Sequence, residues 1–303
     1  MSAPVVQVRT RLESDQVAAV ESLLTAAERA DGTPPVNEAG RLLLRHPRPG
    51  ARHLLAYANG TLVGYAQLDD GPAQSTAQLV VGPDARRRGV GRSLLDRALD
   101  EATGPVQIWA MGDSDGARRL ADEVGLQRRR ELLVMTRSLD DTLPTEAASP
   151  VPDGVRVRTF RPGTDEAGWL ALNAAAFAGH PEQGRLTRTD LDERMAESWF
   201  DPAGFFLAAT GGADETDTET MVGFHWTKQH PDRLGEVYVL GVAPSLSGRG
   251  LGKALLGAGL RHLRDRGNTT VELYVEADHR GAVGLYQGYG FTVAGRDVMY
   301  GQG

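Results

Sequence analysis

At 303 residues the chain is long for one domain and sufficient for two. Hydrophobic residues make up 41% and charged residues 24%, as in ordinary globular proteins, and the net charge of −7 argues against a general nucleic-acid binder. The chain contains no cysteine, which excludes disulfides, thiolate metal sites and a cysteine nucleophile.

The N-terminal residues 1–10 lack the basic and apolar regions of a secretion signal, and no apolar run is long enough to span a bilayer. We therefore expect a cytoplasmic monomer that binds no membrane. The basic run Arg86–Arg88 has no interleaved aromatic residues, so it does not predict nucleic-acid binding.

The first half of the chain combines strand and helix periodicities, and Asn59-Gly60 is a strong signal for a type I′ hairpin turn. A glycine-rich loop separates a buried strand from a helix. The predicted elements, in chain order, are strand 5–10, helix 14–30, hairpin 53–68, strand 77–81, helix 91–102, strand 106–111, helix 116–125 and a strand pair near 130–139.

The second half repeats this order of signals. Its predicted elements are strand 155–160, helices within 165–199, strands 204–210 and 221–228 joined by an acidic insert (211–220), strand 235–242, helix 252–267, strand 271–277 and helix 282–291. We predict an α/β (α+β) protein with a tandem repeat, in which each half has a mixed, mostly antiparallel sheet flanked by helices.

A segment rich in Pro, Ser, Asp and Glu separates the two halves and has neither helical nor strand periodicity. It predicts a linker at 141–154, between an N-terminal domain at 1–140 and a C-terminal domain at 155–303.

The glycine loops occur twice at a fixed separation. Pro83 and Pro244, Gly89 and Gly250, and Gly91 and Gly252 are each 161 positions apart. In such a loop the backbone N–H groups and the helix N-terminus converge on one point, which suits a phosphate. A single copy is equally well explained by permissive glycines at a helix start, but two copies after Val-rich strands favour a binding site. The arginines of the first copy would reinforce it electrostatically.

The order Pro-x-x-Arg-x-x-Gly-x-Gly at 83–91 resembles the acyl-CoA pyrophosphate loop of the GNAT acetyltransferase superfamily, and 277–291 resembles its closing helix. Within the superfamily, residues 173–184, 223–228, 235–242 and 273–278 resemble the second domain of the tandem mycothiol synthase family. Ser247 departs from the usual Gln or Arg and His279 from the usual Asn, which puts individual cofactor contacts in doubt.

The resemblance implies two GNAT-like domains that use acetyl-CoA as acyl donor. It also implies acetylation of the cysteinyl amine of cysteinyl-glucosaminyl-inositol, a small pseudodisaccharide amine, in the last step of mycothiol biosynthesis. The acyl-CoA contacts that it implies are Leu240, Gly241, Val242, Ser247, Gly248, Arg249, Gly250, Leu251, Gly252, Lys253 and His279 in the second half, and Val81, Gly82, Pro83, Arg86, Arg87, Arg88, Gly89, Val90, Gly91 and Arg92 in the first.

Acetyl transfer to an amine needs a base, stabilisation of an oxyanion and a proton for the leaving thiolate. Glu236, at the start of the strand that leads to the loop, is the candidate base through a water, and Tyr286 is the candidate acid. Backbone N–H groups near Leu240, where the strand should splay, would hold the thioester carbonyl. Without the resemblance, a surface glutamate and a core tyrosine explain the two side chains as well or better.

The first half has Ser75 in place of Glu236 and Ala121 in place of Tyr286. We therefore expect it to bind acyl-CoA without catalysing transfer.

The resemblance also implies substrate contacts at Glu38, Glu182, Lys228, Glu236 and Tyr274, although each side chain is also typical of an ordinary surface or packed position. His180, His225 and His230 lack metal-ligand spacing with partners, so no metal site is predicted. Two alternative functions remain open: a GNAT acetyltransferase for another amine, such as a protein N-terminus or an antibiotic, and a non-catalytic acyl-CoA sensor.

Overall fold

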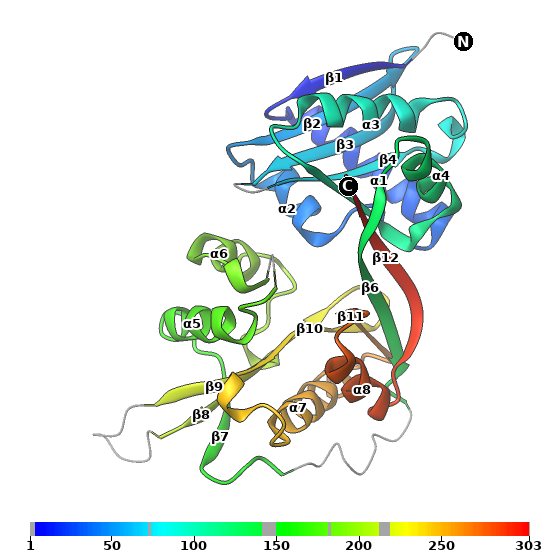
Figure 1. The fold of residues 1–303 in the computed structure, drawn as a ribbon. Helices are drawn as coiled ribbons and strands as arrows, with labels where there is room; N and C mark the ends of the chain where they lie inside the picture. Colours follow the sequence, from blue (N-terminus) through cyan, green and yellow to red (C-terminus); the bar gives the residue numbers. More distant parts are fainter. Residues whose placement is uncertain (1–3, 72–73, 141–149, 181–182, 212–218, 303) are drawn as a thin grey trace. The chain divides into compact units, whose positions relative to one another are not determined.

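The computed structural model describes residues 4–71, 74–140, 150–180, 183–211 and 219–302. Its contacts divide the chain into two compact units (Figure 1). Unit 1 comprises residues 1–132 and 295–303, and unit 2 comprises residues 133–294. Among the described residues, no helix has the length and apolar character that crossing a membrane requires.

Unit 1 has a mixed sheet in the order β1-β2-β3-β4-β5-β12, in which β4 and β5 are parallel and the pairs β1–β2, β2–β3, β3–β4 and β5–β12 are antiparallel. Its elements are β1 (Val5–Arg9), α1 (Ser14–Asp31), α2 (Glu38–Arg45), β2 (Ala51–Ala58), β3 (Thr61–Asp70), β4 (Ser75–Val81), η1 (Pro83–Ala85), α3 (Val90–Glu101), β5 (Val106–Ala110), η2 (Met111–Asp113), α4 (Asp115–Glu123), the start of β6 (Gln127–Ser138) and the end of β12 (Thr292–Gly301).

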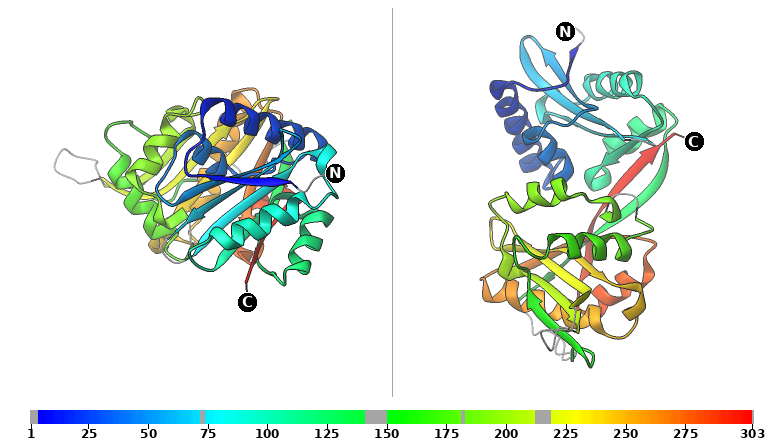
Figure 2. Two further views of the ribbon diagram at one scale, coloured as in Figure 1. Left: turned by 90° about the horizontal axis from the view of Figure 1, so that it is seen from above. Right: turned by 90° about the vertical axis from the view of Figure 1, so that its left-hand side faces the viewer.

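Successive side chains of each strand point to opposite faces of this sheet, and helices cover both faces. Leu54 and Leu68 face the core that contains α3 and α4, whereas Leu55 and Tyr65 face the core that contains α1 and part of α2. The right-hand view of Figure 2 shows α1 and α2 in dark blue on one side of the strands and α3 on the other. The turn at Asn59-Gly60 has positive φ at both residues (51° and 79°), as the predicted type I′ hairpin requires.

Unit 2 has the order β6-β11-β10-β9-β8-β7, in which β10 and β11 are parallel and the pairs β9–β10, β8–β9 and β7–β8 are antiparallel. Its elements are the end of β6, β7 (Val155–Thr159), α5 (Glu166–Ala176), η4 (Gln183–Arg185), α6 (Arg188–Met195), η5 (Pro202–Gly204), β8 (Phe205–Thr210), β9 (Thr220–Gln229), β10 (Leu234–Val242), η6 (Pro244–Leu246), α7 (Leu251–Asp265), β11 (Thr270–Glu276), α8 (Arg280–Gly288) and the start of β12.

Helices also cover both faces of the unit 2 sheet. Trp169 of α5 packs with Phe205 and Trp226 on one face, and Leu255 of α7 packs on the other. On α7, a Cβ at Gly259 would lie 2.0 Å from the ring of buried His225, so this glycine lets the helix approach the sheet. The tandem mixed α/β fold predicted from the sequence is confirmed.

The described segments differ from the sequence-based expectation in three places. Residues 127–138 form the single strand β6 rather than a strand pair, and α2 and β12 were not predicted. Residues 133–140 belong to unit 2 and 295–303 to unit 1, whereas the expected boundaries were 1–140 and 155–303. The physical reason is that the end of β12 pairs with β5 in the unit 1 sheet, where Val298 lies opposite Ala110. Most of the expected linker, residues 141–149, lies outside the described residues.

Candidate active site

The glycine loop of unit 2 leads into the N-terminus of α7. After η6, the backbone passes through Gly248 (φ 75°) and Gly250 (φ 87°) before the helix begins at Leu251. Both φ values are in the left-handed region, which glycine adopts without a steric penalty. The side chains of Ser247 and Arg249 are exposed. The loop therefore has the geometry of an anion site at a helix N-terminus.

Gly252, in the first turn of α7, is not required by packing. A Cβ at this position would meet Val242 at 3.8 Å and Leu285 at 3.9 Å, which are ordinary van der Waals contacts. The protein itself would accommodate alanine here, so close approach of a ligand to the backbone is the remaining reason for a glycine. This loop therefore fits the diphosphate of an acyl-CoA.

The loop of unit 1 follows the same path with a different residue. Arg87, at the 161-residue offset from Gly248, has φ 61°, and Gly89 has φ 80°. Val90 begins α3 and is buried in the core, while Val81, Gly82 and Pro83 join the end of β4 to η1.

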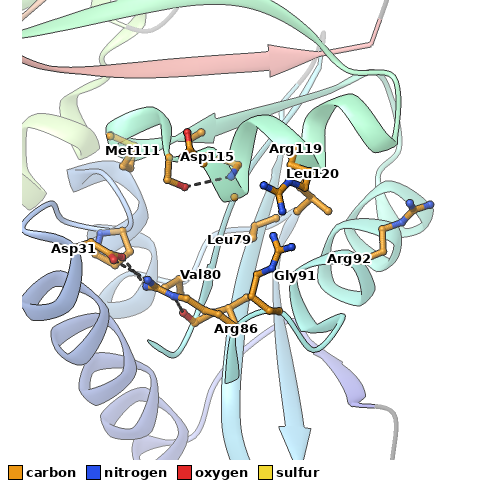
Figure 3. Close-up of a pocket in the computed structure, with 18 of the residues that line it drawn as sticks. Asp31, Leu79, Val80, Arg86, Gly91, Arg92, Met111, Asp115, Arg119 and Leu120 are labelled. Carbon is orange, nitrogen blue, oxygen red and sulfur yellow. Dashed lines mark hydrogen bonds and ion pairs between the residues drawn. The ribbon is translucent and has the colours of Figure 1, made fainter. Parts of the chain in front are cut away.

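Beside this loop, unit 1 has a cavity of about 970 Å³ (Figure 3). Its size is at the upper end of typical small-molecule sites, roughly 300–1,000 Å³. The lining includes Asp31, Arg86, Gly89, Gly91 and Arg119. Arg86 donates from both terminal nitrogens to the Asp31 carboxylate, at 2.7 Å each, so its charge is already paired. Elsewhere on the loop and α3, Arg88 is exposed and Arg92 pairs with Asp96 at 2.8 Å.

In unit 2 the parallel strands β10 and β11 part early. Their register runs only from Leu234↔Thr270 to Glu236↔Glu272, although both strands continue beyond that point. Directly after it, the β9–β10 register shifts between Val237 and Val239, which marks an irregularity of the β-bulge type. The β3–β4 register of unit 1 has no such shift. The splay expected near Leu240 therefore lies just before it, in unit 2.

Glu236 is buried at the point where the two strands part. Its Oε2 lies 2.6 Å from Nε2 of His230 and 3.9 Å from Nζ of Lys228. Glu272 Oε1 lies 3.8 Å from the same imidazole nitrogen. The buried carboxylate is therefore not an isolated charge, because an ammonium and an imidazole lie beside it.

Two aromatic rings lie close to the ammonium of Lys228. Its ammonium lies 4.7 Å from the ring centroid of Trp199 and 5.2 Å from that of Tyr238. Arg194 donates to the hydroxyl of Tyr238 at 2.8 Å. Glu236 and Lys228, both predicted from the sequence, are therefore brought together, and the cation–π contacts stabilise the ammonium where it is largely desolvated.

Tyr286 of α8 is buried in the core of unit 2, edge-on to Phe291 with ring centroids 5.8 Å apart. Burial raises the pKa of its phenol, because the phenolate would be poorly solvated. The side chain therefore stays protonated around neutral pH, which an acid for a leaving thiolate requires.

The other predicted cofactor positions of unit 2 have several local roles. Gly241 is required by packing, since a Cβ would lie 2.6 Å from Phe224. Leu251 belongs to the core, whereas Lys253 is exposed. His279 is the N-cap of α8 and accepts a hydrogen bond from the Ala282 N–H at 3.3 Å through Nδ1. The departure from asparagine thus keeps a side-chain acceptor at this cap.

The remaining predicted substrate residues do not form one group in the described structure. Tyr274 is 41% exposed on β11. Glu38 begins α2 in unit 1, and Glu182 lies outside the described residues. In unit 1, Ser75 donates to Asp70 at 2.5 Å at the position of Glu236, and Ala121 is part of the core.

Sequence reasoning missed two functional candidates, His230 and Glu272. Alternation along β11 offered a signal for Glu272: Val271, Leu273 and Val275 are buried, so Glu272 shares the opposite face with Tyr274, which was predicted. No such signal marks His230 in the sequence, where it only lacks metal-ligand spacing. Its position beside Glu236 depends on the turn between β9 and β10.

The profile of the acetyltransferase (GNAT) family matches residues 18–126 and 171–291. The chain is 52% identical over 295 residues to a mycothiol acetyltransferase of Streptomyces griseus, covering 95% of this chain and 92% of that protein. It is 49% identical over 291 residues to the one of Thermomonospora curvata, covering 95% and 94%.

Among solved structures, a tandem GNAT protein from the clavulanic acid biosynthesis pathway is similar, with a TM-score of 0.73, 20% identity and 98% of each chain covered. A GCN5-related N-acetyltransferase from Sphaerobacter thermophilus has a TM-score of 0.69 and 26% identity, covering 98% of this chain and 95% of that one. The former likeness concerns the fold alone.

Proposed function

This chain belongs to the acetyltransferase (GNAT) family, and from this membership we propose that it is an acetyl-CoA-dependent N-acetyltransferase of mycothiol biosynthesis whose chemistry takes place in unit 2. The acceptor is the cysteinyl amine of cysteinyl-glucosaminyl-inositol, and the reaction is the last step of the pathway.

One observation carries the assignment of the chemistry to unit 2. Glu236 is a buried carboxylate at the point where β10 and β11 part, next to the strand that leads into the glycine loop. The corresponding residue of unit 1 is Ser75, whose hydroxyl is occupied by Asp70. A base is therefore present beside one loop and absent from the equivalent position in the other.

The residues of unit 2 fit an acyl-CoA. Gly248, Gly250 and Gly252 leave backbone N–H groups at the start of α7 accessible to the diphosphate. When bound, acetyl-CoA supplies an acetyl group activated as a thioester. Beyond Glu236 and Glu272, β10 and β11 no longer pair with each other, and the pantetheine arm would lie between them, with backbone N–H groups near Leu240 facing the thioester carbonyl oxygen.

Glu236 removes a proton from the substrate ammonium through a water, which makes the nitrogen nucleophilic. Lys228, whose Nζ lies 3.9 Å from Glu236 Oε2, offsets the negative charge of this buried carboxylate. The amine nitrogen then forms a bond to the acetyl carbon, and the carbon–sulfur bond breaks. Tyr286 donates its phenolic proton to the departing sulfur and regains a proton from the second N–H that the nitrogen loses as the amide forms; burial raises the pKa of the phenol, so it is protonated before and after the step.

The acceptor is a polyol and needs several hydrogen-bonding side chains. Lys228 and Tyr274 of unit 2 are proposed to bind it, together with Glu182 and Glu38. Unit 1 is proposed to bind acyl-CoA without catalysing transfer, in the cavity beside Gly89 and Gly91.

Acetyl-CoA consumption should be measured with cysteinyl-glucosaminyl-inositol and with a panel of other amines, including peptides with free N-termini and aminoglycosides. We expect kcat/KM to be highest for the cysteinyl pseudodisaccharide. Faster turnover of another amine would redirect the assignment to that acceptor, and binding of acetyl-CoA without turnover of any amine would indicate a sensor.

A further inference from the structure

The imidazole of His230 is held against the proposed base by a turn of unusual backbone conformation. Asp232 and Arg233, between β9 and β10, both have φ 61°. Left-handed conformations are uncommon for residues other than glycine and cost of the order of 1 kcal/mol each. The His230 N–H donates to the Leu234 carbonyl at 2.8 Å, which closes the turn. The fold thus returns His230 to the strand that carries Glu236.

His230 and Glu236 contact each other directly through one hydrogen bond. The distance between Nε2 and Oε2 is 2.6 Å, typical of a strong charge-assisted hydrogen bond. Glu272 Oε1 lies 3.8 Å from the same nitrogen, and Lys228 Nζ lies 3.9 Å from Glu236 Oε2. One ligand atom of each of His230, Glu236 and Glu272 lies within 4.8 Å of the others, and in this arrangement His230 and Glu236 contact each other directly.

His230 is also the member of this group with the most contact with solvent. Its side chain is 27% exposed, compared with 9% for Glu236 and 17% for Glu272. Within the part of the chain that the structure describes, its side chain makes no further hydrogen bond, so the second ring nitrogen can exchange protons with water. Imidazole changes its protonation state readily near neutral pH, which carboxylates in water do not.

We propose that His230 carries the proton taken up by Glu236 out to solvent, assisted by Glu272. The inference rests on the proposed function. The substrate ammonium loses a proton through water to Glu236, which becomes a carboxylic acid. That proton passes from Oε2 to Nε2 of neutral His230, and the carboxylate is restored. The resulting imidazolium, stabilised by Glu272, releases its Nδ1 proton to water, and exchange of the remaining Nε2 proton for one at Nδ1 through water restores the tautomer that accepts the next proton.

Two substitutions separate proton transfer from simple positioning. His230→Gln keeps a side-chain amide that can donate to Glu236 but cannot carry a proton. His230→Ala removes both properties. If His230 carries the proton, both variants should lose roughly 10- to 100-fold in kcat, at the lower end of general acid–base effects, with little change in the KM for acetyl-CoA. Added imidazole should partly restore the kcat of the His230→Ala variant. The restored rate should increase with the concentration of neutral imidazole.

Glu272→Gln should lower kcat less and should move the acidic limb of the pH profile, since it removes one charge facing the imidazole. His46→Gln, in unit 1 and outside the proposed chemistry, serves as the control and should leave kcat unchanged. Acetyl-CoA affinity and thermal melts of every variant verify that the fold is intact.

Wild-type activity in the His230→Gln variant, or no rescue of His230→Ala by imidazole, would overturn the proton-carrier role. So would activity that is lost on dialysis against a chelator and regained with Zn²⁺, since this would indicate a metal at the cluster. The failure of the proposed function looks different: the wild-type protein itself would then not acetylate the cysteinyl amine.

Discussion

Glu236 and Glu272 are the last paired residues of the parallel strands β10 and β11, so their two carboxylates are neighbours at the point where the strands part. Like charges at this separation repel unless cations or protons lie between them. His230 faces both carboxylates, and Lys228 faces Glu236. This charge arrangement around Glu236 leads to the first prediction.

Glu236→Gln should lower kcat by roughly 10²- to 10⁴-fold while acetyl-CoA binding is nearly unchanged, because the amide cannot accept the ammonium proton. The loss should become smaller as the pH rises, since more of the substrate amine is then already neutral. Pre-steady-state rates of acetyl transfer across pH measure this. A uniform rise of KM at every pH would instead indicate that Glu236 only positions the substrate.

Tyr286→Phe should slow acetyl transfer and should do so less with donors whose thiolate is a better leaving group, because such a thiolate needs its proton less. Tyr286→Phe removes one oxygen atom and keeps the buried ring, so its packing against Phe291 should change little. Rates with a series of acetyl thioesters measure the dependence.

Tyr289→Phe, in the same region of α8, is the matched control. The Tyr289 hydroxyl donates to the Lys253 carbonyl at 2.8 Å, so this variant should lose about 1 kcal/mol of stability and keep its kcat. Equal kcat values for the two variants would contradict an acid role for Tyr286.

Gly252→Ala should weaken acetyl-CoA binding in unit 2 without destabilising the fold, because the new Cβ meets only ordinary contacts. Alanine in a helix should even add about 0.5–1 kcal/mol of stability. Gly91→Ala, whose Cβ would meet Val81 and Leu120 at 3.5 and 3.6 Å, is the equivalent change in unit 1. Titration calorimetry and kcat/KM should show that Gly252→Ala lowers turnover, whereas Gly91→Ala hardly changes it. The opposite result would place the productive site in unit 1.

Unit 2 should become less stable as the pH falls from about 6.5 to about 4. Burial lowers the pKa of His225 from 6.5 to about 4, because the imidazolium would be desolvated. Between these values the unfolded chain binds a proton that the folded chain does not, so protonation favours unfolding. The loss should reach roughly 3 kcal/mol at pH 4 and be absent above pH 6.5.

His225→Asn tests this assignment. Its amide can still donate to the Leu255 carbonyl, which accepts from Nδ1 of His225 at 2.8 Å, but it does not titrate. Urea unfolding at several pH values should show a smaller decrease of the free energy of unfolding between pH 6.5 and 4 in the variant. An unchanged slope would assign the acid sensitivity to other groups.

Residues 1–140 expressed alone should not fold cooperatively, although they contain the whole first repeat. They lack the end of β12, including the fully buried Val298 and Met299, which completes the sheet beside β5. Fusion of residues 292–302 to this fragment should restore a cooperative thermal transition, followed by circular dichroism. A cooperative transition of residues 1–140 without the added strand would show that β12 is dispensable.

The sequence by itself determined the duplication, the fold class and the anion loops. These depend on local signals, such as Asn59-Gly60 at a hairpin or Gly250 before a helix, whose conformational requirements lie within a few residues. Glu236 could be proposed because its strand leads directly into such a loop, and its proposed role also needed the family resemblance.

Only the tertiary structure decided which strand completes which sheet. Nothing in the sequence of β12 selects one sheet edge over another, and the match between Val298 and Ala110 depends on residues nearly two hundred positions apart. The same holds for the pairing of Arg86 with Asp31 and of His230 with Glu236. Charges and imidazoles carry no periodic signal of their own, so their partners are set by distances that only the folded chain defines.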